Sequence, residues 1–193
     1  MNKKTIKSTP FGPVVIIWDM PGDRPKIMRV LLSKPSESAL EKLNNMYLML
    51  REESCKEIDF IAAGMLSFLE GESVDFSLDI ADLDSCGKFQ QRVLRAEHGI
   101  PRGEVSTYKL IARHLGVPGG ARAVGNALAG NPFPLIIPCH RAIRSDFTLG
   151  GYQGGLEMKQ CLLIKEGIFF SDSGKVKCSH FFYEKVTEGN YGR

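Results

Sequence analysis

The chain has 193 residues, of which 43% are hydrophobic and 24% are charged, a composition typical of one large or two small globular domains. No apolar run approaches the ~20 residues of a membrane-spanning helix, and Val14–Trp18 is too short for a signal-peptide core, so we expect no membrane partner and no secretion. The five cysteines are scattered without a Cys-x-x-Cys pair, which argues against a zinc knuckle or a disulfide framework and favours a cytoplasmic setting, or a nuclear one in a eukaryote.

The net charge of +3 is unevenly distributed along the chain. Residues 86–167 hold 11 Lys and Arg against 5 Asp and Glu, whereas the remainder holds 14 against 17. A basic segment beside an acidic one favours a polyanionic partner for the basic part. A solvated surface with uneven charge would give the same counts, so charge alone leaves both interpretations open.

Residues 1–84 are expected to form an α/β domain that ends in a linker. The β-branched run Val14–Trp18 and the apolar positions of residues 26–32 predict two strands, joined by a turn at Pro21-Gly22. The pattern indicates a mixed or antiparallel sheet with helices packed on it.

Two helices are predicted in this first domain. Ser36 is a candidate N-cap for the first, and the second should end at Gly71. Their apolar stripes indicate core packing and comprise Leu40, Leu43, Tyr47 and Leu50, then Ile58, Ile61, Met65 and Phe68. Alternation over residues 74–78 predicts a short strand, and the acidic residues 79–85 predict the linker.

Residues 85–170 change in character and predict a mainly α domain, followed by a polar tail over 171–193. A first helix carries the apolar positions Phe89, Val93, Leu94 and Ala96. Ser106 is a candidate cap for a second helix, and the third, 121–129, consists of small residues with Arg122 as its only charge. Helix, short glycine-containing turn and helix form the pattern of a helix-turn-helix, here winged-helix-like. Tight packing of the small residues against another helix is the alternative.

The most reactive group in the sequence is Cys139, in the motif Pro138-Cys139-His140-Arg141. This motif lies between the apolar residues 135–137 and the glycine-rich residues 149–155. The thiolate is the reactive form of cysteine, and an adjacent imidazole can take the thiol proton. A cysteine that only fills space in the core is the alternative. We expect the other cysteines to be structural because they lack such neighbours: Cys55, Cys86, Cys161 and Cys178.

Seven ordered segments within residues 86–168 resemble the O6-alkylguanine-DNA alkyltransferases, also called methylated-DNA–protein-cysteine methyltransferases. The segments are Gly103–Tyr108, Ala121–Gly125, Gly130–Pro132, Ile137–Arg141, Leu149–Tyr152, Gly154–Leu156 and Glu166–Gly167. The resemblance implies a monomer that binds the minor groove of double-stranded DNA, flips out O6-alkylguanine and transfers the alkyl group irreversibly to its own Cys139, once per molecule. It implies no cofactor. The cysteine and histidine set that binds zinc in some members is absent from the N-terminal half, so we expect no metal.

The resemblance also implies catalytic roles for five residues. Cys139 is the acceptor, His140 draws off its proton through a water, and Glu166 holds this relay in place. Tyr108 donates a proton to the guanine ring nitrogen as the base leaves, and Asn131 braces the site. Such a donor is needed because guanine leaves poorly unless its developing negative charge is neutralised.

Further roles that the resemblance implies concern DNA and the substrate pocket. Arg122 enters the duplex in place of the flipped base, which must leave the stack because its target atom is inaccessible inside the DNA helix. The other expected DNA contacts are Ala121, Ala123, Gly125, Tyr108 and Arg141. The expected pocket residues are Pro134, Ala142, Tyr152 and Gln153. Taken singly, Glu166 would fit a surface carboxylate and Asn131 a turn residue, but the joint spacing favours function.

Two departures from the family pattern and three rival functions accompany this interpretation. Phe147 stands where the family often has glycine, which could change lesion size preference or loop mobility, and Ala142 stands where valine is more usual. A non-catalytic, lesion-binding relative would replace Cys139. A helix-turn-helix transcription regulator would need a longer, polar recognition helix than 121–129 offers. A cysteine protease takes its histidine from elsewhere in the chain, so the adjacent His140 does not suit it.

Overall fold

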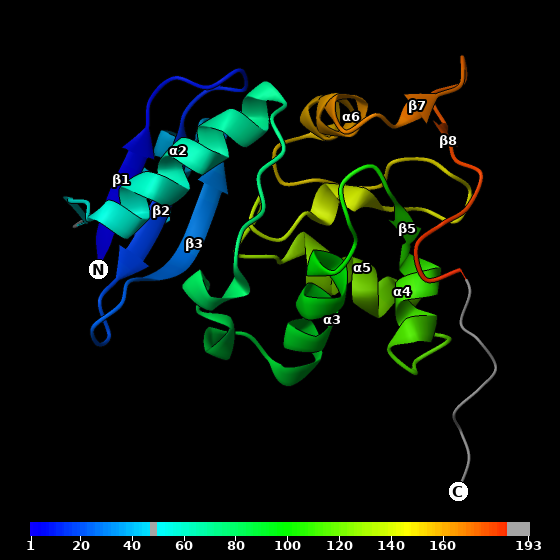
Figure 1. Cartoon of the computed structure of the whole chain (residues 1–193), viewed down its shortest axis with the longest axis horizontal. Coiled ribbons are helices and arrows are strands. Elements are labelled where there is room, and N and C mark those ends of the chain that lie inside the picture. Colours follow the sequence, from blue (N-terminus) through cyan, green and yellow to red (C-terminus); the bar gives the residue numbers. More distant parts are fainter. Residues whose placement is uncertain (47–49, 185–193) are drawn as a thin grey trace, which may run out of the picture.

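A computed structural model describes residues 1–46 and 50–184 of the chain. The elements of the N-terminal half are β1 (Asn2–Ile6), β2 (Val14–Asp19), β3 (Lys26–Leu32), α1 (Ala39–Met46), β4 (Arg51–Glu52), α2 (Lys56–Glu70), η1 (Leu78–Ile80) and η2 (Leu83–Ser85). Those of the C-terminal half are α3 (Lys88–His98), β5 (Ser106–Thr107), α4 (Tyr108–His114), α5 (Ala121–Ala129), η3 (Cys139–Arg141), β6 (Ala142–Ile143), α6 (Leu156–Lys165), β7 (Phe169–Phe170) and β8 (Val176–Lys177). Figure 1 shows a sheet-containing half beside a mainly helical half, as the sequence predicted.

The N-terminal sheet has four strands in the order β3-β2-β1-β4, and only β1 and β4 pair in parallel. Its central strand β2 is buried on both faces: Val15 and Ile17 pack toward α1, whereas Ile16 and Trp18 join the core that contains α2. Both predicted strands are confirmed. β1 was not predicted because its sequence is basic and polar, and it forms by pairing along its whole length with β2.

Two details of the predicted N-terminal half need correction. Residues 74–78 do not form a strand in the structure, because Ser77 caps η1 by accepting a hydrogen bond from the backbone of Asp79. The first helix begins at Ala39, and Ser38 rather than Ser36 caps it, since its hydroxyl accepts from the Glu41 amide at 3.1 Å. The predicted linker contains η1 and η2, and the amide of Asp82 donates to Ile27 in β3. The first predicted helix corresponds to α1, and Tyr47 of its predicted apolar stripe lies outside the described residues.

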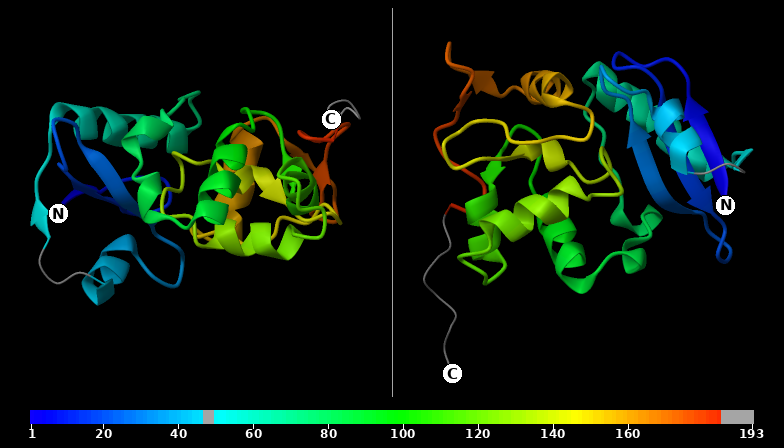
Figure 2. Two further views of the ribbon diagram at one scale, coloured as in Figure 1. Left: turned by 90° about the horizontal axis from the view of Figure 1, so that it is seen from below. Right: turned by 180° about the vertical axis from the view of Figure 1, so that it is seen from behind.

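The two halves share one hydrophobic core, which includes residues of β2, α2, α3 and α5. Hydrogen bonds reinforce this contact: the Val30 amide donates to Pro132 at 2.7 Å, and Arg102 donates to the carbonyls of Gly71 and Lys165 at 2.6 and 2.7 Å. Both views in Figure 2 keep the halves side by side. The sheet therefore supports the segment that carries the cysteine motif.

The predicted helix-turn-helix is formed by α4 and α5, which pack on α3. Thr107, rather than Ser106, caps α4 by accepting from the Leu110 amide at 3.2 Å, whereas the Ser106 hydroxyl donates to the Phe182 carbonyl at 2.6 Å. Gln90 of α3 donates to two carbonyls at the end of α5. The position of α5 is thus fixed from within the domain.

The described part of the predicted tail, residues 171–184, packs on the C-terminal half. The Phe182 amide donates to Val105, and the Tyr183 hydroxyl donates to Ala96, both at 2.9 Å. Aromatic residues in a polar segment supply this packing, and residues 185–193 lie outside the described part. Within the described ranges, no helix combines the length and apolarity that crossing a membrane requires.

Candidate active site

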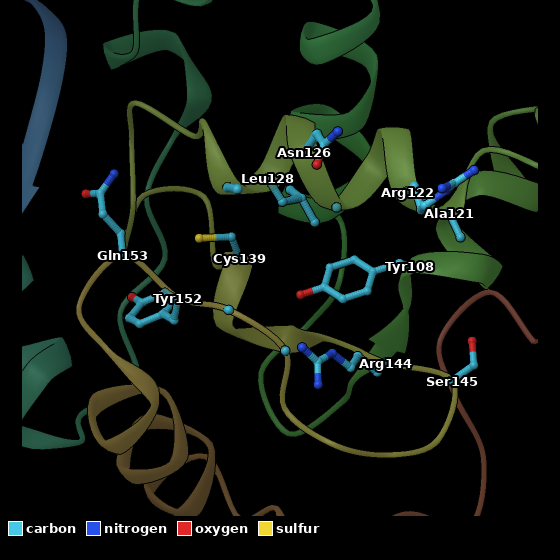
Figure 3. Close-up of a pocket in the computed structure, with 14 residues that line it drawn as sticks. Tyr108, Ala121, Arg122, Asn126, Leu128, Cys139, Arg144, Ser145, Tyr152 and Gln153 are labelled. Carbon is cyan, nitrogen blue, oxygen red and sulfur yellow. The ribbon is translucent and has the colours of Figure 1, made fainter.

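A cavity of about 640 Å³ lies between α5, the start of α4 and the loop that follows the cysteine motif (Figure 3). Seven of its lining residues were predicted: Tyr108, Ala121, Arg122, Gly125, Cys139, Tyr152 and Gln153. The sequence interpretation missed Asn126, Leu128, Ala129, Arg144, Ser145, Gly150 and Gly151. Most of these lie on α5 or in the glycine-rich loop, so their positions next to predicted residues were the available signal.

Cys139 is the first residue of η3, and only 7% of it is exposed. Burial raises the pKa of its thiol to about 11, and the negative charge of Glu97 acts in the same direction, whereas a hydrogen bond from Asn131 and the charge of Lys159 oppose the shift. The group is therefore a thiol at neutral pH. Nucleophilic attack by Cys139 requires a base that removes this proton.

His140, Arg141 and Glu166 form a buried network directly behind the cysteine. Nε2 of His140 lies 3.1 Å from Oε1 of Glu166, and Arg141 donates to both oxygens of Glu166 at 2.9 and 2.7 Å. Burial alone would raise the pKa of Glu166, but its bonds to His140 and Arg141 lower it to about 2. An ionised carboxylate can only accept, so Nε2 of His140 carries the proton and Nδ1 is the free base.

The location of Arg141 corrects one predicted role. This residue was expected to contact DNA, but it is only 7% exposed, and its guanidinium donates to Glu166 and to the Ile100 carbonyl at 2.7 Å. Its donors point into the protein because the buried carboxylate needs a counter-charge. Arg141 therefore holds the buried His140–Glu166 network together and is not available as a DNA contact.

Tyr108 is the first residue of α4, and its hydroxyl faces the cavity beside Gly150. Burial raises the pKa of Tyr108 to about 12, so the phenol keeps its proton and can donate it. A Cβ atom at Gly150 would lie 2.6 Å from the Tyr108 hydroxyl, and Gly150 has a φ of +70°. Both facts require glycine at this position of the loop.

Asn131 is buried between α5 and the cysteine motif. Its amide nitrogen donates to the Ile137 carbonyl at 3.3 Å, and its oxygen accepts from the Phe133 amide at 2.9 Å. These bonds hold the chain that leads into Cys139, so Asn131 lies where the resemblance placed a bracing residue.

The predicted DNA and pocket residues divide into two groups. Arg122 and Ala123 are exposed on α5, whose buried side consists of Val124 and Leu128. Pro134 and Ala142 do not line the cavity, contrary to expectation: Pro134 is buried where the chain bridges to Ile137, and Ala142 is fully buried in β6. Ala142 belongs to the main hydrophobic core of the molecule.

Two buried charged residues next to this site were not predicted. Lys159 of α6 donates to the Ala142 carbonyl at 2.6 Å, and burial lowers its pKa to about 8. Both carboxyl oxygens of Glu97 are buried without a hydrogen-bond partner among the described residues, and burial raises the pKa of Glu97 to about 8. No group of His, Cys, Asp and Glu suited to a metal ion occurs within residues 1–46 and 50–184.

Fold and site together define a helix-turn-helix protein with a buried cysteine in a cavity beside α5, the second helix of that motif. The family described as "6-O-methylguanine DNA methyltransferase, DNA binding domain" matches residues 88–168. The methylated-DNA–protein-cysteine methyltransferase of Shigella flexneri is 35% identical over 164 residues, covering 83% of this chain and 92% of that protein. The chain belongs to the methylated-DNA–protein-cysteine methyltransferase family.

Other similarities differ in extent. The enzyme of the same name from Methanothermobacter thermautotrophicus is 50% identical over 101 residues, covering 52% of this chain and 56% of that protein, so the match spans little more than half of that relative. The structure of Mycobacterium tuberculosis OGT in complex with DNA aligns with a TM-score of 0.67 and 30% identity, covering 86% of this chain and 92% of that one. The Pyrococcus kodakaraensis O6-methylguanine-DNA methyltransferase shares the fold with a TM-score of 0.66 at 20% identity, covering 86% of this chain and 99% of that one.

Proposed function

We propose that this protein repairs DNA by moving the alkyl group of O6-alkylguanine onto Cys139 in a single, irreversible turnover. The observation that carries the proposal is the position of Cys139, which lines the cavity that also contains Tyr108 and Arg122. The His140–Glu166 pair behind it supplies a base, and family membership supports the same reaction.

In the proposed reaction, the Cys139 sulfur bonds to the alkyl carbon while the bond from that carbon to guanine O6 breaks. Guanine keeps the electron pair of the broken bond. The thiol proton passes to Nδ1 of His140 through solvent, and the phenol of Tyr108 protonates the departing guanine. Return of the proton from His140 to Tyr108 restores both residues and leaves a thioether, which offers no ready route back.

The proposed substrate is double-stranded DNA, bound as a monomer through α5 in the minor groove. The exposed side of α5 offers small residues beside Arg122, so the helix can approach the backbone of a narrow groove closely. Arg122 lies at the cavity and would fill the gap left by the flipped base, which offsets part of the cost of unstacking. Action on DNA implies a location in the cytoplasm, or in the nucleus of a eukaryote.

The decisive experiment is the intact mass of the protein after incubation with duplex DNA that carries one O6-methylguanine. A stoichiometric gain of one methylene that maps to the Cys139 peptide is expected. The Cys139→Ala variant should gain nothing while still binding DNA, and Cys161→Ala serves as the matched control. Lesion binding by the wild type without any gain in mass would contradict the proposal and indicate a non-catalytic, lesion-binding relative.

A further inference from the structure

The turn over residues 144–148 is a closed unit that forms part of the cavity wall. The Phe147 amide donates to the Arg144 carbonyl at 3.0 Å, and the Arg144 amide donates to the Thr148 carbonyl at 2.9 Å. Arg144 lines the cavity, whereas Phe147 lies at the opposite end of the turn and is 41% exposed. A contact that fixes Phe147 therefore also fixes the cavity wall.

Phe147 makes two contacts with the C-terminal segment, residues 169–184. Its carbonyl accepts from the Val176 amide at 3.0 Å, and its ring stacks on Phe181 with centroids 5.2 Å apart and planes inclined by 14°. The φ of Phe147 is +70°, a left-handed conformation that costs energy for a residue with a bulky side chain. The stack on Phe181 and the hydrogen bond from Val176 support Phe147 in this conformation.

The C-terminal segment is itself fixed to the domain at Phe181 and at the residue that follows it. Phe181 packs on the buried cluster that contains Val105 and Ile143. The next residue, Phe182, accepts a hydrogen bond from the Ser106 hydroxyl at 2.6 Å, so β5 and the segment are joined next to the stack. In Figure 1 the segment, orange to red, runs past β5 toward α4. Phe181 is thus a fixed support for the turn.

The other end of the same loop presses on the catalytic tyrosine. Gly150 lies so close to Tyr108 that even a methyl group would meet the phenol oxygen at 2.6 Å. Because Gly150 lines the cavity and lies against Tyr108, withdrawal of this loop from Tyr108 would widen the cavity for a bulkier group on guanine. Since the turn is closed, that movement would break the Phe147–Phe181 stack.

We propose that Phe147 and Phe181 are positioning residues that hold the loop of residues 144–151 against Tyr108 and thereby favour small alkyl groups over bulky ones. The inference rests on the proposed function, in which the cavity receives the alkylated base. Neither aromatic ring touches the reacting atoms, so the stack acts on specificity through the loop.

The test compares single-turnover transfer to Cys139 from two duplexes, one with O6-methylguanine and one with O6-benzylguanine. Phe181→Ala should raise the benzyl-to-methyl rate ratio about three- to tenfold, the effect expected from the loss of one aromatic stack. Phe147→Gly should raise the ratio similarly, and the double variant should add little, because both changes remove one contact. Phe181→Tyr keeps the stack and should restore the wild-type ratio. Phe169→Ala is the control, since Phe169 is 74% exposed.

Two results would overturn the inference while leaving the proposed function intact: an unchanged ratio in Phe181→Ala, or effects of Phe147→Gly and Phe181→Ala that add fully in the double variant. If Phe181→Ala does not fold, Phe181→Leu keeps the apolar packing without the stack and takes its place under the same criteria. Failure of the wild type to transfer either group would instead refute the proposed function.

Discussion

In the proposed reaction Glu166 orients the base that receives the proton of the cysteine, because its carboxylate accepts from both His140 and Arg141. Three hydrogen bonds converge on its two oxygens, and the neighbouring positive charge keeps it ionised. Burial lowers the pKa of His140, so the imidazole is neutral before reaction and can accept the proton of Cys139. The chain thus combines a thiol of raised pKa with an oriented neutral base.

Replacing Glu166 by Gln should slow alkyl transfer by about 10²-fold or more, the usual contribution of an oriented acid–base partner. The amide can turn its NH2 group toward Nε2 of His140, which would stabilise the tautomer that presents Nδ1–H to the cysteine. Single-turnover transfer from an O6-methylguanine duplex measures the effect. Glu157→Gln, which removes an exposed carboxylate on α6, is the control. Wild-type transfer by the Glu166 variant would show that the relay does not operate.

Gly150→Ala should reduce transfer by about tenfold or more, since an added Cβ would meet Tyr108 and a left-handed backbone disfavours any side chain there. Gly151→Ala is the matched control because a Cβ at Gly151 meets nothing within 4 Å. The measurement is the single-turnover rate, with the thermal transition of each variant as a check on folding. Equal rates for the two variants would contradict the requirement for glycine at this position.

At the level of elements, local sequence patterns were sufficient to predict those segments whose structure depends on their own residues. The small-residue run of α5 and the glycine end of α2, where Gly71 has a φ of +112°, were predicted from sequence and are confirmed. β1 was not predicted, because its sequence has no strand pattern of its own and it forms a strand by pairing with β2. Glu97 and Lys159 escaped notice although each occupies an apolar position of its helix, four residues from Val93 and from Leu163. A charged residue at an apolar position of a helix was the sequence signal that could have identified both as buried ionisable groups.

The exposed side of α5 leads to a prediction about DNA. Arg122→Ala should weaken repair of duplex DNA about 10- to 100-fold, the range that corresponds to part of the unstacking cost. Transfer from the free base O6-benzylguanine should change little, because no base has to be flipped. Arg24→Ala, in the exposed turn between β2 and β3, is the control for loss of one positive charge. An equal loss with both substrates would exclude a flipping role for Arg122.

At the scale of the whole molecule, the core around the site contains ionisable groups whose pKa values are shifted in opposite directions by burial. Burial raises the pKa of Glu97 and lowers that of Lys159, so each titrates near neutral or mildly alkaline pH. Arg141, Tyr108 and Cys139 belong to the same electrostatic environment. The stability of the fold is therefore linked to pH through the residues that surround the reactive thiol.

The pH dependence can be assigned to Glu97 by replacing it with Gln. The pKa of Glu97 rises from its ordinary 4.5 to about 8 on folding, so the folded protein binds this proton more tightly than the unfolded chain does. The resulting stabilisation is complete below pH 4.5 and is lost as the pH rises toward about 8, at a total cost on the order of a few kcal/mol.

The Glu97→Gln variant has no carboxyl group at this position, so its stability does not fall with pH for this reason. The midpoint temperature of thermal unfolding of this variant should therefore rise relative to that of the wild type as the pH increases over this interval, when both are measured in the same buffers. Lys159, which titrates near the upper end of the interval and above it, adds little to the difference at lower pH. A gap between the two proteins that stays constant with pH would show that Glu97 ionises in the folded state as readily as in the unfolded chain.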